Sequence, residues 1–295
     1  MGEPPAGRRA AIRLPPRFAA RAREVLDGNV APVTPRNAAT VMLLRPGLGS
    51  AEPGAAAGPG LRVYMLRRRS SMAFAAGAYV FPGGSVDPSD DDAGVAWAGP
   101  DAAEWGRLLD APAELARTLV CAAVRETVEE CGVLLAGPDA GTVLAAAEDE
   151  GWEEDRRQLL AGSLSLAQLL HRRGLVLRSD LLRPWARWIT PVTEERRYDT
   201  RFFAAALPAG QIARDVSGEA DETAWLAPEA ALEAAGRREI ALFPPTAVTL
   251  GELRACGSVA AALAARRRMT ALIPEVMVAE GAAWLTVPDS VEYPL

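Results

Sequence analysis

The stretch C-A-A-V-R-E-T-V-E-E-C-G-V at residues 121–133 places three glutamates within five positions of an otherwise mostly apolar segment. Pro112 suits the first turn of a helix, and Gly132 is typical of a helix C-terminal end. The pattern between them predicts a helix from about residue 113 to residue 131. The glutamates therefore fall in its last turns, where a globular helix usually carries apolar or solvated residues.

On a helix with 100° per residue, Glu126, Glu129 and Glu130 share one face. The same face continues toward the N-terminus with apolar residues, namely Leu115, Leu119 and Ala122. The opposite side is also apolar and carries Val120, Val124, Val128 and Cys131. We therefore expect this helix to be covered on two sides, with its carboxylates partly removed from water.

Three neighbouring carboxylates in such surroundings raise one another's pKa unless a cation neutralises them. Hard oxygen ligands of this kind suit Mg²⁺ or Mn²⁺. The alternative is a solvated acidic face balanced by arginines, which charge patterning alone favours for an arbitrary E-x-x-E-E. Other features of the sequence are needed to choose between a cation site and a solvated acidic face.

The overall composition is that of a soluble globular protein, with 49% hydrophobic and 24% charged residues. The 38 acidic and 32 basic residues give a net charge of −6, which argues against nucleic acid as the main partner. The three cysteines lack metal-ligand spacing, and no apolar run is long enough to cross a membrane. We expect a cytoplasmic protein without a membrane partner.

Strands and helices do not alternate strictly along the chain, which favours an α+β layered domain. The predicted strands are 38–45, 61–67, 78–81, 133–136, 185–191, 201–207 and 222–226. Besides the helix at 113–131, the pattern predicts helical pieces within 140–182 and helices at 228–237, 245–256 and 258–268. The tail from Ile273 is predicted to be extended.

The stretch R-E-T-V-E-E-C-G-V closely resembles the core of the Nudix box, G-x5-E-x7-R-E-U-x-E-E-x-G-U, in which U is a bulky apolar residue. F-P-G-G at 81–84 resembles the start of that box. The segments 197–206 and 219–232 are similar to the later strands and following helix of Nudix hydrolases. The resemblance covers roughly 38–235 and implies an α/β/α sandwich with a mixed central sheet.

By resemblance, Glu126, Glu129 and Glu130 would bind Mg²⁺ or Mn²⁺, and the backbone carbonyl of Gly84 would complete the metal shell. Arg125 would hold the carboxylates in place. The implied chemistry is attack of a metal-activated water on a phosphorus of a small nucleoside diphosphate-linked substrate.

The box is interrupted. Arg125 stands 41 positions after Gly84, where the uninterrupted motif has 14, so about 27 residues are inserted. Eight residues before Arg125, where the motif has its first glutamate, stands Arg117. We interpret this acid as missing or displaced, with Glu114 or an acid from 85–104 as its replacement.

An insertion inside the box and a second one after it resemble the branch of the family similar to the peroxisomal coenzyme A diphosphatase. The stretch G-A-Y-V-F-P-G-G at 77–84 agrees with the last part of the coenzyme A signature, whereas Ala73 stands where that signature has an arginine. Coenzyme A or an acyl derivative is therefore the predicted substrate. NADH-like dinucleotides and nucleotide sugars are the alternatives.

Other charged residues are candidates for the same site. Glu222 is a further possible ligand or base, although a strand-end glutamate can simply be exposed. Arg67 and Arg69 could bind phosphates by charge-assisted hydrogen bonds, or could be solvated strand-end arginines.

Arg197 and Arg201 flank Tyr198 and Phe202, and we predict that the guanidinium groups reach the diphosphate. Stacking of the rings on a nucleobase competes here with core packing of the phenylalanine.

The sequence thus predicts an N-terminal extension (1–37), a Nudix domain (38–235) with insertions at about 85–110 and 140–182, and a C-terminal helical extension (236–295) packed on the same domain. We expect a metal-dependent diphosphate hydrolase, and the sequence leaves open whether the protein forms a homodimer. The rivals are a catalytically impaired Nudix-fold binding or regulatory module and a structural acidic helix in an unrelated fold.

Overall fold

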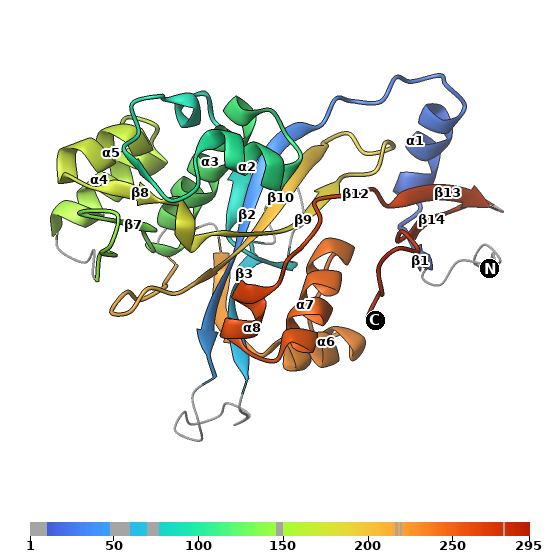
Figure 1. Cartoon of the computed structure of the whole chain (residues 1–295). Coiled ribbons are helices and arrows are strands. Elements are labelled where there is room, and N and C mark those ends of the chain that lie inside the picture. The colour runs from blue at the N-terminus through green and yellow to red at the C-terminus, as the bar shows by residue number, and fades with distance from the viewer. Residues whose placement is uncertain are drawn as a thin grey trace.

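A mixed β-sheet forms the centre of the computed structural model, which describes residues 11–47, 60–69, 77–145, 150–215, 218, 220–279 and 281–295. Its strands run in the order β11-β3-β2-β10-β9-β12 (Figure 1). They are β2 (Arg36–Pro46), β3 (Leu61–Arg68), β9 (Arg183–Ile189), β10 (Tyr198–Ala206), β11 (Ala220–Leu226) and β12 (Ala271–Leu272). The pairs β10–β2 and β12–β9 are parallel and the others antiparallel, so the expected mixed sheet is confirmed.

Two short strands fill the end of the sheet where β2 and β3 are not paired with each other. β4 (Tyr79–Val80) pairs with β3, and β5 (Gly83–Ser85) pairs with β2. The segment F-P-G-G crosses between them, and its glycines lie beside the middle of the sheet. Ala39 of β2 has Gly84 on one side and Arg201 on the other.

Helices cover both faces of this sheet, which confirms the α/β/α sandwich. On one face, α3 (Ala113–Cys131) packs with α2 (Ala102–Leu109) over a core that includes Tyr64 and Phe203. On the other face lie α6 (Pro228–Gly236), α7 (Pro244–Cys256) and α8 (Val259–Ala264), over a core that includes Met65 and Trp185 (Figure 1). Prolines in the first turn start α6 and α7, as their fixed φ favours. The third helix ends at Ala264 rather than near residue 268.

The segment between β5 and α3 is more ordered than the sequence indicates. It contains a 3-10 turn (Pro88–Asp91), β6 (Trp97–Ala98) and α2. Within this segment Leu109 is fully buried, and Trp105, 1% exposed, meets Phe203 edge to face. The insertion therefore contributes to the core over α3.

The two insertions contact each other. β8 (Val176–Arg178) pairs with β6 from the first insertion and with β7 (Ala136–Gly137), forming a small three-stranded sheet. The second insertion also holds α4 (Glu150–Leu160), α5 (Leu166–Arg173) and a 3-10 turn (Ser179–Leu181), so it is only partly helical. The strand predicted at 133–136 is reduced to β7.

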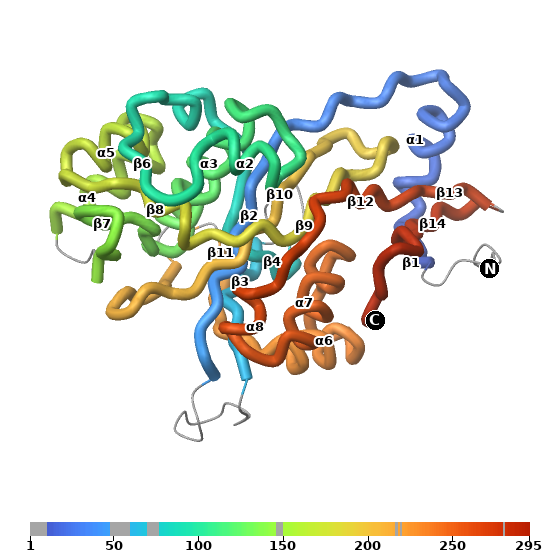
Figure 2. Tube along the Cα trace, viewed as in Figure 1, coloured from blue at the N-terminus to red at the C-terminus, as the bar shows by residue number. Residues whose placement is uncertain are grey.

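After the end of α6, the described helices of residues 236–295 are α7 with 13 residues and α8 with 6, so the segment is less helical than the predicted helical extension. After α8 the chain forms β12 in the central sheet and then the hairpin β13 (Glu275–Ala279) and β14 (Ala282–Thr286), so the tail is extended as expected. β14 also pairs with β1 (Ala11–Arg13), and α1 (Arg17–Leu26) packs on these strands. The tube in Figure 2 shows this unit beside the main sandwich.

Candidate active site

α3 supplies most of the acidic side chains of the candidate site. It follows Pro112 and ends at Gly132, whose φ of 68° favours glycine. Its second half is almost completely enclosed, and both Glu126 and Glu130 are 8% exposed. Acidic side chains in the last turn oppose the helix macrodipole, and this turn has no basic residue to offset them. The helix therefore carries its carboxylates at an electrostatic cost.

The glycines of β5 face these carboxylates directly. The backbone N–H of Gly83 donates to Oε2 of Glu130 at 2.8 Å. A Cβ added at Gly84 would lie 2.7 Å from Cδ and 2.8 Å from Oε2 of Glu126. Only glycine leaves room for the Glu126 carboxylate here, so the two halves of the interrupted motif are adjacent, as predicted.

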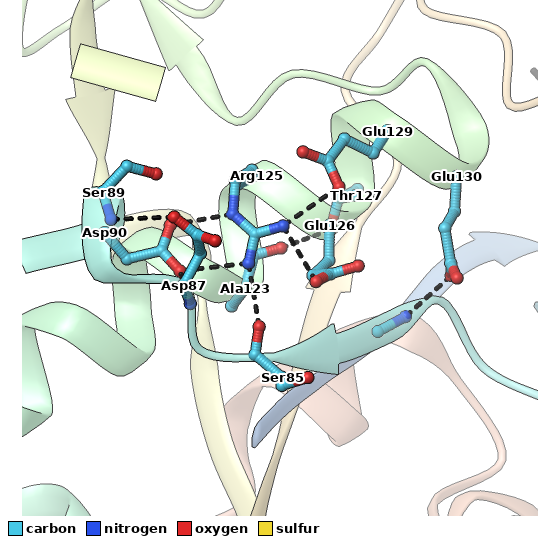
Figure 3. Close-up of polar contacts among 11 residues, drawn as sticks. Ser85, Asp87, Ser89, Asp90, Ala123, Arg125, Glu126, Thr127, Glu129 and Glu130 are labelled. Atoms are coloured by element: carbon cyan, nitrogen blue, oxygen red, sulfur yellow. Dashed lines mark hydrogen bonds and ion pairs between the residues drawn. The ribbon is translucent and has the colours of Figure 1, made fainter. Parts of the chain in front are cut away.

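Arg125 connects the acidic residues of the site (Figure 3). Its Nη1 donates to Oε1 of Glu126 at 2.9 Å and to Oε2 of Glu129 at 3.0 Å. Its Nη2 donates to the carbonyl oxygen of Ser85 at 3.0 Å. The predicted role of Arg125, which is to hold the carboxylates in place against β5, agrees with these contacts.

Asp90 completes this network and was not singled out from the sequence. Its Oδ1 accepts from Nε of Arg125 at 2.8 Å, and its Oδ2 accepts from Nη2 at 3.0 Å. Asp90 is the sixth residue after Gly84, the position of the first acid in G-x5-E. Counting forward from Gly84 finds it, whereas counting back from Arg125 finds Arg117, because the insertion follows the acid.

Burial and charge shift the pKa values of this cluster. Burial raises the pKa of Glu129 to about 7, the Arg125 guanidinium opposes that shift, and the charge of Glu126 adds to it. Burial by itself would lower the pKa of Arg125, but its hydrogen bonds to Asp90 and the neighbouring charges raise it above the usual range. Arg125 thus contacts the carboxylates of Asp90, Glu126 and Glu129, whereas Glu130 accepts from the backbone N–H of Gly83.

The donor chemistry of this cluster fits a hard divalent cation. Carboxylate oxygens gather on one backbone segment at the negative end of a helix, and a cation there would relieve both their mutual repulsion and the dipole term. Within the described part of the chain, no three acidic, histidine or cysteine side chains are already arranged closely enough to hold a metal ion. Nη1 of Arg125 contacts one carboxylate oxygen of Glu126 and one of Glu129, and so holds the two carboxylates side by side.

Arg67 and Glu222 lie on the other face of the sheet. They are cross-strand neighbours on β3 and β11, their side chains form an ion pair of 3.4 Å, and each is about half exposed. Side chains alternate along β3, so Arg67 points away from α3, together with Met65. The structure thus does not bring Glu222 to the carboxylates of α3, which corrects its prediction as a catalytic residue.

The Arg67–Glu222 pair lines a cavity of about 750 Å³ together with Tyr79, Arg238 and Leu242. Tyr79 is four residues before Gly83, and an extended chain spans at most about 3.6 Å per residue. The wall of the cavity is therefore within about 14 Å of the Gly83 backbone.

The other predicted substrate ligands have different surroundings. Arg197 is 9% exposed and donates to the carbonyl oxygens of Val33 and Thr190. Arg201 is 2% exposed and pairs with Asp199 at 2.6 Å. Both guanidinium groups are thus enclosed and bonded within the fold, Arg201 through its Nη1, which counts against both predictions.

The remaining residues of these predictions are placed as follows. Phe202 is 6% exposed in the core, the outcome that competed with base stacking. Arg69 is exposed at the end of β3, and Ala73 lies outside the described residues.

The sandwich, the glycines of β5 and the acidic end of α3 together define a protein of Nudix type. The solved NUDIX hydrolase from Alicyclobacillus acidocaldarius superposes with a TM-score of 0.64 and 27% identity, covering 79% of this chain and 97% of that one. Within this class, the family model of the NUDT19 Nudix domain matches residues 96–253, more than half of the chain. The chain belongs to this Nudix family.

Two curated relatives are similar along most of the chain. The acyl-coenzyme A diphosphatase NUDT19 of Gallus gallus is 30% identical over 264 residues, which cover 71% of this chain and 65% of the relative. That of Xenopus laevis is 27% identical over 229 residues, covering 65% and 59%. The chain spans less than two thirds of the length of either relative. No described helix is long and apolar enough to cross a membrane.

Proposed function

We propose that this chain is a Mg²⁺- or Mn²⁺-dependent hydrolase that cleaves a diphosphate bond in a small nucleotide-derived molecule. The observation that carries the proposal is the Arg125 network, in which one guanidinium holds Asp90, Glu126 and Glu129 against β5. The interrupted motif is thereby complete in space. A binding module with decayed catalytic residues has no reason to retain a buried, fully connected cluster of this kind.

Glu126, Glu129, Glu130 and the carbonyl of Gly84 would hold the cation. When bound, it lowers the pKa of a water molecule and stabilises charge on the diphosphate oxygens. Asp90 and Arg125 would orient the carboxylates. Hydrolysis adds one water across the P–O–P bridge and leaves two phosphate esters.

The substrate we propose is coenzyme A or an acyl derivative, cleaved to phosphopantetheine and adenosine bisphosphate products. The names of the chicken and frog relatives support it, as does the pattern of two insertions. The cavity lined by Arg67 is large enough for part of such a molecule, since ligand pockets usually have about 300–1,000 Å³. We therefore keep Arg67 as a proposed substrate ligand, with Arg69 beside it.

A side-by-side chromatographic assay with Mg²⁺ or Mn²⁺ tests this proposal. Coenzyme A, an acyl-coenzyme A, NADH, ADP-ribose and nucleoside triphosphates are compared at equal concentration. Fastest cleavage of a coenzyme A species is the expected result. Faster cleavage of another compound would contradict the substrate but retain the reaction, and no cleavage of any would favour the binding module.

We further propose that the protein is cytoplasmic, has no nucleic-acid partner, forms a homodimer and is divided into domains at the limits given above. Size-exclusion chromatography with light scattering tests the homodimer directly.

A further inference from the structure

Arg117 stands at the position that is acidic in an uninterrupted box, and its contacts are all with the first insertion. Its Nη2 lies 3.4, 3.2 and 3.1 Å from the carbonyl oxygens of Asp92, Ala93 and Val95. Its guanidinium carbon is 5.0 Å from the centre of the Trp97 ring, a cation–π distance. The Arg117 side chain of α3 thus contacts four residues of the inserted segment between positions 92 and 97.

A second contact supports the first. Thr118, the next residue of α3, has its hydroxyl oxygen 3.2 Å from Oδ1 of Asp91. Asp91 directly follows Asp90, whose own Oδ2 accepts from the backbone N–H of Asp87 at 2.8 Å. The chain on both sides of Asp90 is therefore held in place while its carboxylate reaches Arg125.

Helix geometry places the two arginines along one side of α3. Arg117 and Arg125 are eight residues apart, which corresponds to about 12 Å along the axis and about 80° around it. The segment from Asp90 to Trp97 runs between them, bound at one end by Arg125 and further along by Arg117. The insertion is thus fastened to the same helix that carries the catalytic carboxylates.

The charge at position 117 follows from this arrangement. A glutamate there would face three carbonyl oxygens, which repel a carboxylate, whereas a guanidinium donates to them. The insertion also separates Asp90 from Arg125 by 35 positions instead of eight. Loop-closure statistics make their meeting in a flexible chain roughly tenfold rarer. Extra contacts are needed to offset that loss.

We propose that Arg117 is a positioning residue, which fastens the inserted segment to α3 and thereby keeps Asp90 on Arg125 and the carboxylates in the spacing that a cation requires. This inference rests on the proposed function for its consequence on turnover. Its structural part, the fastening itself, can be measured without any substrate or metal.

The fastening is tested by hydrogen exchange of the 295-residue chain. Arg117→Ala removes every contact, and Arg117→Lys keeps a positive charge but removes the planar guanidinium that carries Nη2 and lies over Trp97. Arg107→Ala removes an exposed arginine of α2 and is the matched control. The probes are the amides of Asp87 and Gly83, which bond to Asp90 and Glu130. We expect about tenfold faster exchange in Arg117→Ala, a smaller increase in Arg117→Lys and none in Arg107→Ala.

The consequence for the site is tested with Mn²⁺ binding and turnover. In Arg117→Ala we expect the Mn²⁺ concentration for half-saturation to rise and kcat to fall, each about tenfold, with the KM for substrate changed less than twofold. Because Arg117 acts through Asp90, adding Arg117→Ala to Asp90→Asn should change kcat by less than twofold. Arg117→Lys should recover part of the loss.

The outcomes separate the two proposals. Unchanged exchange at Asp87 and Gly83 in Arg117→Ala overturns the fastening, whatever the activity. Faster exchange with Mn²⁺ binding and kcat like those of Arg107→Ala overturns the positioning role. A wild-type protein that neither binds Mn²⁺ nor cleaves any diphosphate overturns the proposed function, and the exchange experiment still decides the fastening.

Discussion

Gly84→Ala perturbs the contact between β5 and α3 with a single methyl group. The added Cβ would lie 2.7 Å from Cδ of Glu126, and ordinary contact needs about 3.5 Å or more, so the carboxylate must retreat by roughly 1 Å. The backbone of Gly84 is not in the left-handed region, so alanine brings no conformational strain. The perturbation is therefore confined to the position of one carboxylate.

The cost to folding should be small and the cost to turnover large. Overpacking of about 1–2 kcal/mol is partly offset by the lower entropy of an unfolded chain without the glycine, which contributes about 0.4–1 kcal/mol. The melting temperature should fall by about 2–4 °C for a net loss of about 1 kcal/mol. A misplacement of about 1 Å in a catalytic group can lower kcat about 100-fold.

The assay compares kcat, the half-saturating Mn²⁺ concentration and the melting temperature of Gly84→Ala with those of Gly236→Ala. Gly236 ends α6, its φ is not positive and a Cβ there meets no atom within 4 Å, so this control should be neutral or slightly stabilising. If Gly84→Ala keeps a kcat within twofold of the wild type and binds Mn²⁺ normally, then the position of Glu126 against β5 does not matter and the site is misassigned.

Three further results are expected. Glu129→Gln keeps the shape of the side chain but removes a ligand charge, so kcat should fall by orders of magnitude while the melting temperature is unchanged or higher. A variant with wild-type kcat would remove Glu129 from the mechanism. Trp105→Ala should lower the free energy of unfolding by about 3–5 kcal/mol in urea titrations, because the buried Trp105 ring packs on Phe203. A loss below about 1 kcal/mol would place α2 outside the core. Arg201→Ala should lower the free energy of unfolding by about 1–3 kcal/mol, because it removes a buried charged hydrogen bond while Asp199 keeps its bidentate pair with Arg187. KM should be unchanged, and a stable variant with a raised KM would restore Arg201 as a substrate ligand.

The sequence predicts well the parts whose residues interact locally. The limits of α3 follow from Pro112, Gly132 and a period of 3.6 residues, and the helix begins and ends at the predicted residues. The helical period places Glu126 and Glu130 on one face of α3, and the resemblance to the Nudix box predicts that this face meets Gly84 of β5. These features depend on residues that are close together in the sequence, so their spacing is enough to predict them.

Long-range partners were harder to predict. Asp90 is defined by the distance from Gly84, but the insertion hides its relation to Arg125. Arg201 reads as a phosphate ligand until Asp199, two residues earlier on the same strand, is seen to neutralise it. Trp105 lies in a segment rich in acids and glycines, and only tertiary packing on Phe203 shows that it belongs to the core.

The pairing of β1 with β14 affects how the chain can fold during synthesis. Ala11 pairs with Thr286 and Arg13 with Trp284, so β1 meets its partner strand only after all the residues between the two strands have been synthesised. The central sheet has a similar delay, because β2 needs β10 as its parallel neighbour. Until then the edge of β2 has no neighbouring strand on that side, which exposes nascent chains to aggregation during this interval.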